Sequence, residues 1–318
     1  MVDVSVVIPT RNRSALLALT LRSVVMQRDV DLEVVVVDEA SSDDTPAVIA
    51  GFGDPRIRVI RHERPLGVSA ARNHGTAESR AEWIAFLDDD DLWAPDKLAV
   101  QLKAARDTGA SWVYAGHVNI NTSYQVTGGA PPLSPDRLME QLPQRNVVPG
   151  GCSGVIATKR ALGSAGLFDL RLQTLADWDL WIRLARGGLP ACVPEPLVAY
   201  RLHGGQMSLN ASRAEAEFCI VAESNAEADL GVLLRYLGWW ALRVKNHRDA
   251  FRLFVRAWAQ GRPRRTALAV ADLVMVGRDL MEHRFGIPVR HSIVDPQHES
   301  WRAEGQAWID TLVGARAD

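Results

Sequence analysis

The stretch AEWIAFLDDDDLWAP (residues 81–95) carries an apolar run that leads directly into four consecutive aspartates. The run, WIAFL (83–87), has the composition of a buried β-strand. The aspartates, residues 88–91, follow at the point where such a strand would reach the surface. Adjacent carboxylates repel one another and raise each other's pKa. Three explanations are open: a solvated loop, a helix start that Asp would cap, or a positive partner absent from the sequence.

Two other apolar runs show the same arrangement. VSVVI (4–8) and EVVVV (33–37) are continuous and rich in β-branched residues, as the strands of parallel sheets are. The residues that follow these two runs are Pro9, Thr10, Arg11, Asp38 and Glu39. RIRVIRH (56–62) alternates apolar and polar residues and predicts a fourth strand with one face in water.

Helical segments separate these strands. They are SALLALTLRSVVMQ (14–27), with an apolar stripe, SSDDTPAVIAGF (41–52), which opens with capping residues, and the alanine-rich SAARNHGTAESR (69–80). Alternating strands and helices predict an α/β fold with a mostly parallel sheet covered on both faces. Because ligands of such sheets lie outside the carboxyl ends of the strands, the three polar strand ends predict a single site. The alternative is that they are ordinary polar loops and helix caps.

Composition limits the class of protein. With 318 residues, 36 basic and 38 acidic side chains and a net charge of −2, the chain has no basic excess for binding nucleic acid. Cys152, Cys192 and Cys219 are odd in number and lack the spacing of a zinc site or a disulfide framework. The chain has no run of about 18 apolar residues and does not open like a signal peptide, so no transmembrane segment is predicted. We therefore expect a cytoplasmic protein.

Several motifs, in order, resemble those of one enzyme family. They are VSVVIPTRNR (4–13), VVVVDEASSDDT (34–45), LGVSAARNHGTAESRAEWIAFLDDDDLWAPDKL (66–98) and GLFDLRLQTLADWDLWIRL (166–184). Over residues 3–205 the chain is similar to the family-2 glycosyltransferases of the GT-A fold, which transfer a sugar from a nucleotide donor with inversion. The resemblance implies a catalytic domain over residues 1–208 with a Rossmann-like, mostly parallel sheet flanked by helices. Helical periodicity without strands predicts a C-terminal helical appendage over residues 209–318.

The resemblance offers an explanation for the four aspartates. The family's Asp-x-Asp motif falls on Asp88-Asp89-Asp90. By resemblance, Asp88 or Asp89 contacts the ribose of the donor, and Asp90 holds Mn²⁺ or Mg²⁺ bridging the diphosphate. Such hard cations prefer carboxylate and phosphate oxygens. The carboxylates would then be crowded because their counter-ion arrives with the substrate, and Asp91 is expected to cap the next helix.

The resemblance assigns further residues to the nucleotide: Pro9, Thr10, Arg11, Asp38, Glu39 and Arg72. Asp38 and Glu39 would read the base, because a carboxylate there can accept the imide N–H of uracil or thymine. Arg72 would lie near the diphosphate or the aspartates; the alternative is an ordinary helix-surface arginine. Glu39 stands where the family usually has Asp, and Ala40 where it usually has Gly. We expect a UDP or dTDP donor.

The resemblance also implies a catalytic base and a second metal ligand. In LADWDLWIRLA (175–185), Asp177 matches the Asp that takes the proton of the acceptor; its alternative role is a helix N-cap. Ala176 replaces the Glu that usually precedes this Asp, which puts the mode of acceptor binding in doubt. His203, in YRLHGGQMS (200–208), matches a His that completes the coordination of the metal in related enzymes.

Three other regions have less specific interpretations. The stretch 119–138 is polar and rich in Pro and Gly, which predicts a mobile loop or an acceptor-specific insertion. Cys152, within the Gly-rich segment 146–162 that resembles the family's acceptor side, is interpreted as a packing residue. In the tail, the residues interpreted as core are Trp239, Trp240 and Trp258. A homodimer contact, or a platform for a carrier-bound or membrane-bound acceptor, is the alternative for the tail.

The sequence thus predicts a metal-dependent inverting glycosyltransferase with a nucleotide-sugar donor and an unidentified acceptor, in the cytoplasm or peripheral to a membrane. A nucleotidyltransferase is one alternative, although IPTRNRS (8–14) lacks the glycines of a triphosphate loop. A dinucleotide oxidoreductase is disfavoured because no GxGxxG follows the first strand. A degenerate transferase that serves as a scaffold is the remaining alternative, favoured by Glu39 and Ala176 and opposed by the remaining site residues.

Overall fold

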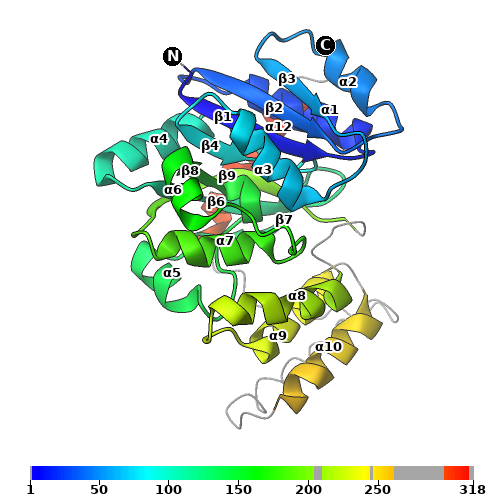
Figure 1. The fold of residues 1–318 in the computed structure, drawn as a ribbon, viewed down its shortest axis with the longest axis vertical. Coiled ribbons are helices and arrows are strands. Elements are labelled where there is room, and N and C mark those ends of the chain that lie inside the picture. The colour runs from blue at the N-terminus through cyan, green and yellow to red at the C-terminus, as the bar shows by residue number, and fades with distance from the viewer. Residues whose placement is uncertain (1, 204–209, 244–245, 261–296, 315–318) are drawn as a thin grey trace. The chain divides into compact units, whose positions relative to one another are not determined.

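The computed structural model describes residues 2–203, 210–243, 246–260 and 297–314 (Figure 1). The chain forms two compact units. The first comprises Met1–Leu142, Val147–Arg201 and Pro296–Asp318, and the second comprises Pro143–Asn146 and Leu202–Asp295. Within the described residues, no helix combines the length and apolarity needed to cross a bilayer.

The first half of the sheet is parallel and matches the predicted strands. Its strands are β1 (Val4–Thr10), β2 (Leu32–Asp38), β3 (Ile57–Arg61) and β4 (Trp83–Phe86), in the spatial order β3-β2-β1-β4. The helices that connect them are α1 (Ser14–Val25), α2 (Thr45–Gly51) and α3 (Val68–Glu78). Every residue of β1 and β2 is buried, as their unbroken apolar runs require. The predicted strands and helices of this half are therefore confirmed, with ends shifted by a few residues.

The second half of the sheet is mixed. Its strands are β5 (Leu92–Trp93), β6 (Trp112–Ile120), β7 (Val126–Ala130), β8 (Val155–Thr158) and β9 (Ala191–Arg201). β8 pairs antiparallel with β4 and β6, while β9 runs parallel to β6, so the sheet continues as β4-β8-β6-β9-β5. The predicted loop or insertion at 119–138 is wrong in part, because β7 pairs antiparallel with the end of β6.

The remaining helices of the first unit flank this sheet. They are α4 (Lys97–Thr108), α5 (Pro135–Gln141), the 3₁₀ turn η1 (Gly151–Gly154), α6 (Lys159–Ala165), α7 (Ala176–Ala185) and α12 (Gln297–Gly314). The sequence predicted one helical region from residue 209 to the end of the chain. In the structure α12 instead belongs to the first unit and packs on β7 and β9 of the sheet. Its Trp301 and Trp308 indole N–H groups donate to the backbone carbonyls of Pro194 and Pro196, both at 2.9 Å.

The second unit is helical in the described residues. It contains α8 (Ala211–Ser224), α9 (Leu230–Arg243) and α10 (His247–Ala259). α9 and α10 pack against each other, and the Asn246 side chain caps α10 by accepting from the Asp249 N–H at 3.2 Å. Trp240 is buried as expected, but Trp239 and Trp258 are 37% and 53% exposed, so the prediction that both are core residues is wrong.

We expect Gly75→Ala to destabilise the protein. A Cβ on Gly75 in α3 would lie far inside van der Waals contact with the Val7 side chain of β1, which is fully buried and cannot move aside. Overpacking of this kind costs about 1–3 kcal/mol of unfolding free energy, more than the helix gains from alanine. Gly163→Ala in α6 is the control, because its Cβ meets no atom within 4 Å. Urea denaturation measures both; equal midpoints would contradict the tight α3–β1 contact.

Candidate active site

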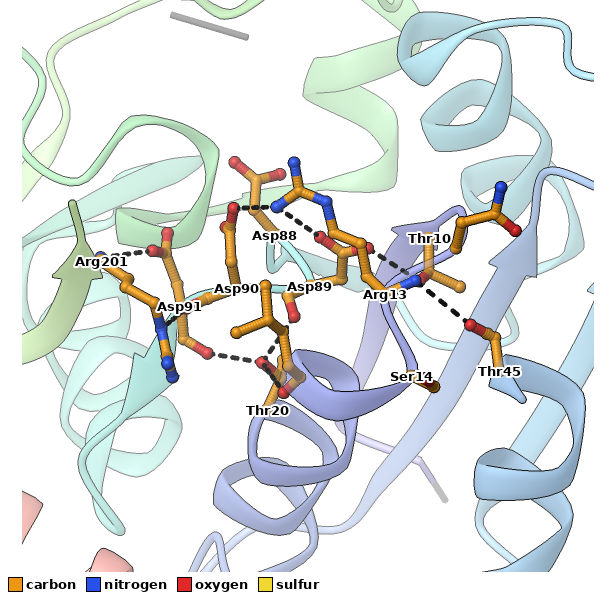
Figure 2. A network of polar contacts seen from close by, with 12 residues as sticks. Thr10, Arg13, Ser14, Thr20, Thr45, Asp88, Asp89, Asp90, Asp91 and Arg201 are labelled. Atoms are coloured by element: carbon orange, nitrogen blue, oxygen red, sulfur yellow. Dashed lines mark hydrogen bonds and ion pairs between the residues drawn. The ribbon is translucent and has the colours of Figure 1, made fainter. Parts of the chain in front are cut away.

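The predicted site residues gather at the carboxyl ends of β1, β2 and β4. These three strands are neighbours in the order β2-β1-β4 and run parallel, so their ends meet at one edge of the sheet. Thr10 ends β1, Asp38 ends β2, and the aspartates 88–91 follow β4 closely. Figure 2 shows Thr10 and the four aspartates converging on one network of polar contacts.

Arginines neutralise the two outer carboxylates of the Asp-x-Asp motif. Arg72, from α3, donates to Asp88 Oδ1 at 2.5 Å and is itself almost fully buried. Arg13, in the loop between β1 and α1, donates to Asp90 Oδ2 at 2.5 Å (Figure 2). The chain therefore supplies positive partners for the crowded aspartates from its own residues, in addition to any cation that arrives with a ligand.

The middle carboxylate, Asp89, is held by contacts with β1 and the loop that follows it. Its Oδ2 accepts from the Thr10 hydroxyl at 2.7 Å, and its Oδ1 lies 3.7 Å from Arg13 Nη1. Burial raises the pKa of Asp89, and the neighbouring Asp90 charge adds to this, bringing the value to about 7. Asp89 is therefore oriented by neighbours inside the protein.

Asp91 does not cap a helix, and that prediction is wrong. The next helix, α4, begins only at Lys97, and Asp91 is completely buried. Its Oδ2 accepts from the Ser153 hydroxyl at 2.6 Å and its Oδ1 from the Arg201 N–H at 3.0 Å. Ser153 Oγ also accepts the Asp88 N–H at 3.1 Å. Asp91 thus ties the aspartate loop to η1 and to the end of β9.

Asp38 is held inside the site by two donors. Its Oδ1 accepts from the Ser41 N–H at 2.9 Å and its Oδ2 from Arg61 Nη1 at 2.5 Å. Arg61 also donates to the Ser41 carbonyl at 2.7 Å, and its side chain is half exposed. An arginine therefore stands beside the carboxylate that was expected to read the base.

Glu39 contacts His62, the residue after β3, and the backbone just before α3. Its Oε2 accepts the backbone N–H groups of Leu66 and Gly67, at 2.8 and 2.6 Å, and its Oε1 contacts His62 Nδ1. His62 Nε2 lies 2.8 Å from His74 Nδ1, which extends the chain of polar groups to the surface of α3. Glu39 therefore fixes the start of α3; contact with the base stays a prediction.

Ala40 lies where the family usually has glycine, and its backbone explains that preference. Its φ is 57°, in the left-handed region that a Cβ disfavours. The chain accepts this strain at the turn that places Asp38 and Glu39.

Asp177 lies at the start of α7 beside the glycine-rich turn. Its Oδ1 accepts the N–H of the next residue, Trp178, at 2.7 Å. Its Oδ2 is 3.5 Å from where a Cβ on Gly151 would lie, and Gly151 has a φ of 54°. Ala176 is buried and brings no carboxylate to this position.

Asp88 and Asp177 both lie near the buried thiol of Cys152. Its thiol is buried, as the packing interpretation expected. Burial raises the pKa of Cys152 well above its usual range, Arg72 opposes this, and Asp88 and Asp177 add to it. Both carboxylates are therefore within electrostatic range of the same thiol, and Arg72 is within range of Asp177.

The positions of the other predicted residues do not test their predicted roles. Pro9 is buried in β1 and Arg11 is exposed beyond its end. His203 is half buried and belongs to the second unit, so its role as a metal ligand stays a prediction. No group of three or more His, Cys, Asp or Glu in the described part of the chain forms a metal site by itself. Asp88 and Asp90 carry carboxylate oxygens, the type of ligand that Mg²⁺ prefers.

Four residues that build this site were not predicted from the sequence: Arg13, Arg61, Ser153 and Arg201. Arg13 lies in the motif that supplied Pro9, Thr10 and Arg11, so that motif could have indicated it. Arg201 donates through Nε to the Asp90 carbonyl at 2.9 Å across 111 residues of sequence. No local signal could have identified that contact.

We expect Asp91→Ala to lower the free energy of unfolding by about 2–3 kcal/mol, because it leaves the Ser153 hydroxyl and the Arg201 N–H buried without an acceptor. Asp91→Asn keeps one acceptor and the same volume, so its cost should be smaller. Asp31→Ala, at an exposed position, is the control and should change stability by less than about 0.5 kcal/mol. Guanidinium unfolding curves measure these changes. If the curves of the three variants coincide, the hydrogen bonds of Asp91 do not stabilise the fold.

Sequence comparisons identify relatives of this chain. The family model described as "Glycosyl transferase family 2" matches residues 5–162. A "PGL/p-HBAD biosynthesis glycosyltransferase" of Mycobacterium bovis is 35% identical over 185 residues, which cover 56% of this chain and 68% of that protein. The "UDP-Glc:alpha-D-GlcNAc-diphosphoundecaprenol beta-1,3-glucosyltransferase WfgD" of Escherichia coli is 24% identical, over 77% of this chain and 94% of that protein.

Solved structures agree on the fold. S. aureus TarS 1-349 in complex with UDP-GlcNAc has a TM-score of 0.58 at 15% identity, over 99% of this chain and 91% of that chain. The mannosyltransferase PcManGT of Pyrobaculum calidifontis, in complex with GDP-Man and Mn²⁺, has a TM-score of 0.53 at 19% identity, over 99% and 87%. The predicted GT-A fold is thereby confirmed. The chain belongs to glycosyl transferase family 2 and is a glycosyltransferase.

Proposed function

We propose that this enzyme transfers a sugar with inversion from a UDP- or dTDP-linked donor to an acceptor nucleophile, with Asp177 as the general base. The observation that carries the proposal is the shared neighbourhood of Asp88 and Asp177 around Cys152, with Gly151 beside the base. One carboxylate belongs to the donor motif and the other to the acceptor-side helix. An acceptor between them would meet the donor and the base together.

In this reaction the acceptor oxygen attacks the anomeric carbon from the face opposite the diphosphate. Its proton passes to the Asp177 carboxylate, the new glycosidic bond forms, and the bond to the diphosphate oxygen breaks. The nucleoside diphosphate leaves with the electron pair. A positioned carboxylate contributes about 10²–10⁴-fold to such a proton transfer. Asp177 has one oxygen held by the Trp178 N–H, which orients the other.

The donor is held through its phosphates and its nucleoside in this proposal. Arg13 and Arg72 can offer charge-assisted hydrogen bonds to the diphosphate. Asp90, with Asp88 beside it, would hold Mn²⁺ or Mg²⁺ together with phosphate oxygens, and the cation would neutralise charge on the leaving group. The Mn²⁺ complex of a structural neighbour supports this assignment. His203 is proposed as a further ligand by resemblance.

The nucleoside is assigned to the ends of β1 and β2. Asp38 would accept a base N–H while it keeps Arg61, because each carboxylate oxygen has more than one acceptor position. Asp89 or Asp88 would contact the ribose, and Pro9, Thr10 and Arg11 would line the pocket. The UDP and UDP-sugar ligands of relatives support a uridine donor.

We expect Asp177→Asn to lower the transfer rate by about 10²–10⁴-fold while leaving nucleotide affinity unchanged, because the amide cannot take the proton. The matched control is Asp107→Asn, an exposed carboxylate on α4 that should keep the wild-type rate. The rate can be measured as nucleoside diphosphate released with a panel of acceptors. Full transfer by Asp177→Asn would eliminate Asp177 as the base.

We expect one nucleotide among UDP, dTDP, GDP and CDP to raise the melting temperature of the protein in the presence of Mn²⁺ or Mg²⁺. A ligand at one hundred times its dissociation constant stabilises the folded state by about 2.7 kcal/mol. Asp90→Asn should abolish the metal-dependent part of the shift, while the Asp107→Asn control keeps it. A nucleotide shift of the same size with and without the metal would contradict the proposed metal site. No shift with any nucleotide would contradict the proposed donor site.

A further inference from the structure

Helix α10 of the second unit carries two apolar faces instead of one. The first face is buried, packs against α9, and consists of Ala250, Leu253, Phe254 and Ala257. The second face is formed by Phe251, Val255 and Trp258, at i, i+4 and i+7, which places them on one stripe of the helix. Phe251 is 54% exposed and Trp258 is 53% exposed. The core therefore accounts for only one of the two faces.

Arginines border the exposed stripe. Arg248 and Arg252 are exposed and lie three residues before and one residue after Phe251. Neither forms an ion pair with another residue in the described part of the chain. The remaining arginine of the helix, Arg256, is instead paired with Glu215 at 2.5 Å. The only acid of α10, Asp249, is on another side of the helix and is hydrogen-bonded by Asn246.

Aromatic rings beside free arginines identify the partner by its chemistry. A helix that lies in a membrane interface presents Trp and Phe to the acyl boundary and Arg to anionic headgroups. Each arginine near an anionic surface adds about 1 kcal/mol of attraction. A second copy of this chain is a poorer match, because a symmetric contact through this stripe would bring like charges from both copies together.

We propose that the exposed face of α10, defined by Phe251, Val255, Trp258, Arg248 and Arg252, docks on an anionic lipid bilayer surface. The aromatic side chains would enter the headgroup region, and the two arginines would pair with lipid phosphates. This inference does not depend on the proposed transfer reaction, since it concerns α10 alone. It gives the enzyme a place at the surface where lipid-linked acceptors would be found.

The test is vesicle co-sedimentation of the full chain, without nucleotide or acceptor. We expect the protein to bind vesicles of phosphatidylcholine mixed with phosphatidylglycerol, to bind phosphatidylcholine vesicles much more weakly, and to dissociate as salt is raised. The double variant Arg248→Gln with Arg252→Gln should bind about 30-fold more weakly, roughly fivefold for each arginine. The double variant Phe251→Ala with Trp258→Ala should lose binding even at low salt.

The control is Leu189→Ala, which removes a side chain of similar exposure (55%) from the first unit. It should sediment like the wild-type chain. Far-UV circular dichroism and melting curves verify that all variants are folded, as expected for substitutions of exposed side chains. Binding that is absent in the wild type, or equal in all variants, overturns the proposal. Light scattering gives a second test. If the wild-type chain does not bind vesicles but forms a dimer, and the aromatic substitutions dissociate that dimer, the face binds a second copy and the proposal is overturned.

Discussion

The electrostatic balance of four adjacent aspartates is the constraint on which the rest of this site depends. Like charges so close would repel, yet residues 89 and 91 are buried at the end of β4. Hydrogen-bond donors from distant segments stabilise these carboxylates, chiefly Arg13, Arg72 and the Arg201 N–H. The aspartate loop can therefore be rigid before a donor binds, and rigid placement is what a site needs to stabilise charge that develops during a reaction.

The same contacts connect the aspartate loop to the predicted base. Ser153 joins Asp88 and Asp91 to the glycine-rich turn, and Gly151 in that turn lies against Asp177. Trp93 adds a hydrogen bond from its indole N–H to the Ser153 carbonyl at 2.8 Å, below the turn. A displacement of the aspartate loop would therefore also change the surroundings of the predicted base, Asp177. This coupling gives a physical reason for placing donor and acceptor residues around one small 3₁₀ turn.

Local periodicity and chain order predict the parallel half of the sheet. The four parallel strands and their helices follow from the sequence because β-branched runs and helical stripes are local features. The role of a residue cannot be predicted in this way where it depends on a distant part of the chain that folds against it. The hairpin of β7, the return of α12 to the sheet and the exposure of Trp258 were all missed. Asp91 was misassigned for the same reason, because both of its partners are more than 60 residues away.

The sequence by itself determined the fold class, the family and the set of carboxylates at the strand ends. Motifs and strand patterns can be recognised in short stretches of sequence, without the tertiary structure. Tertiary structure alone decided how those carboxylates differ. Asp88 and Asp90 pair with arginines, Asp91 is a buried tie, and Glu39 turns toward His62. The physical reason is that the charge state and hydrogen bonds of a carboxylate depend on its burial and its partners. Arg13 and Asp90, 77 residues apart in sequence, become partners only when the sheet brings β1 and β4 together.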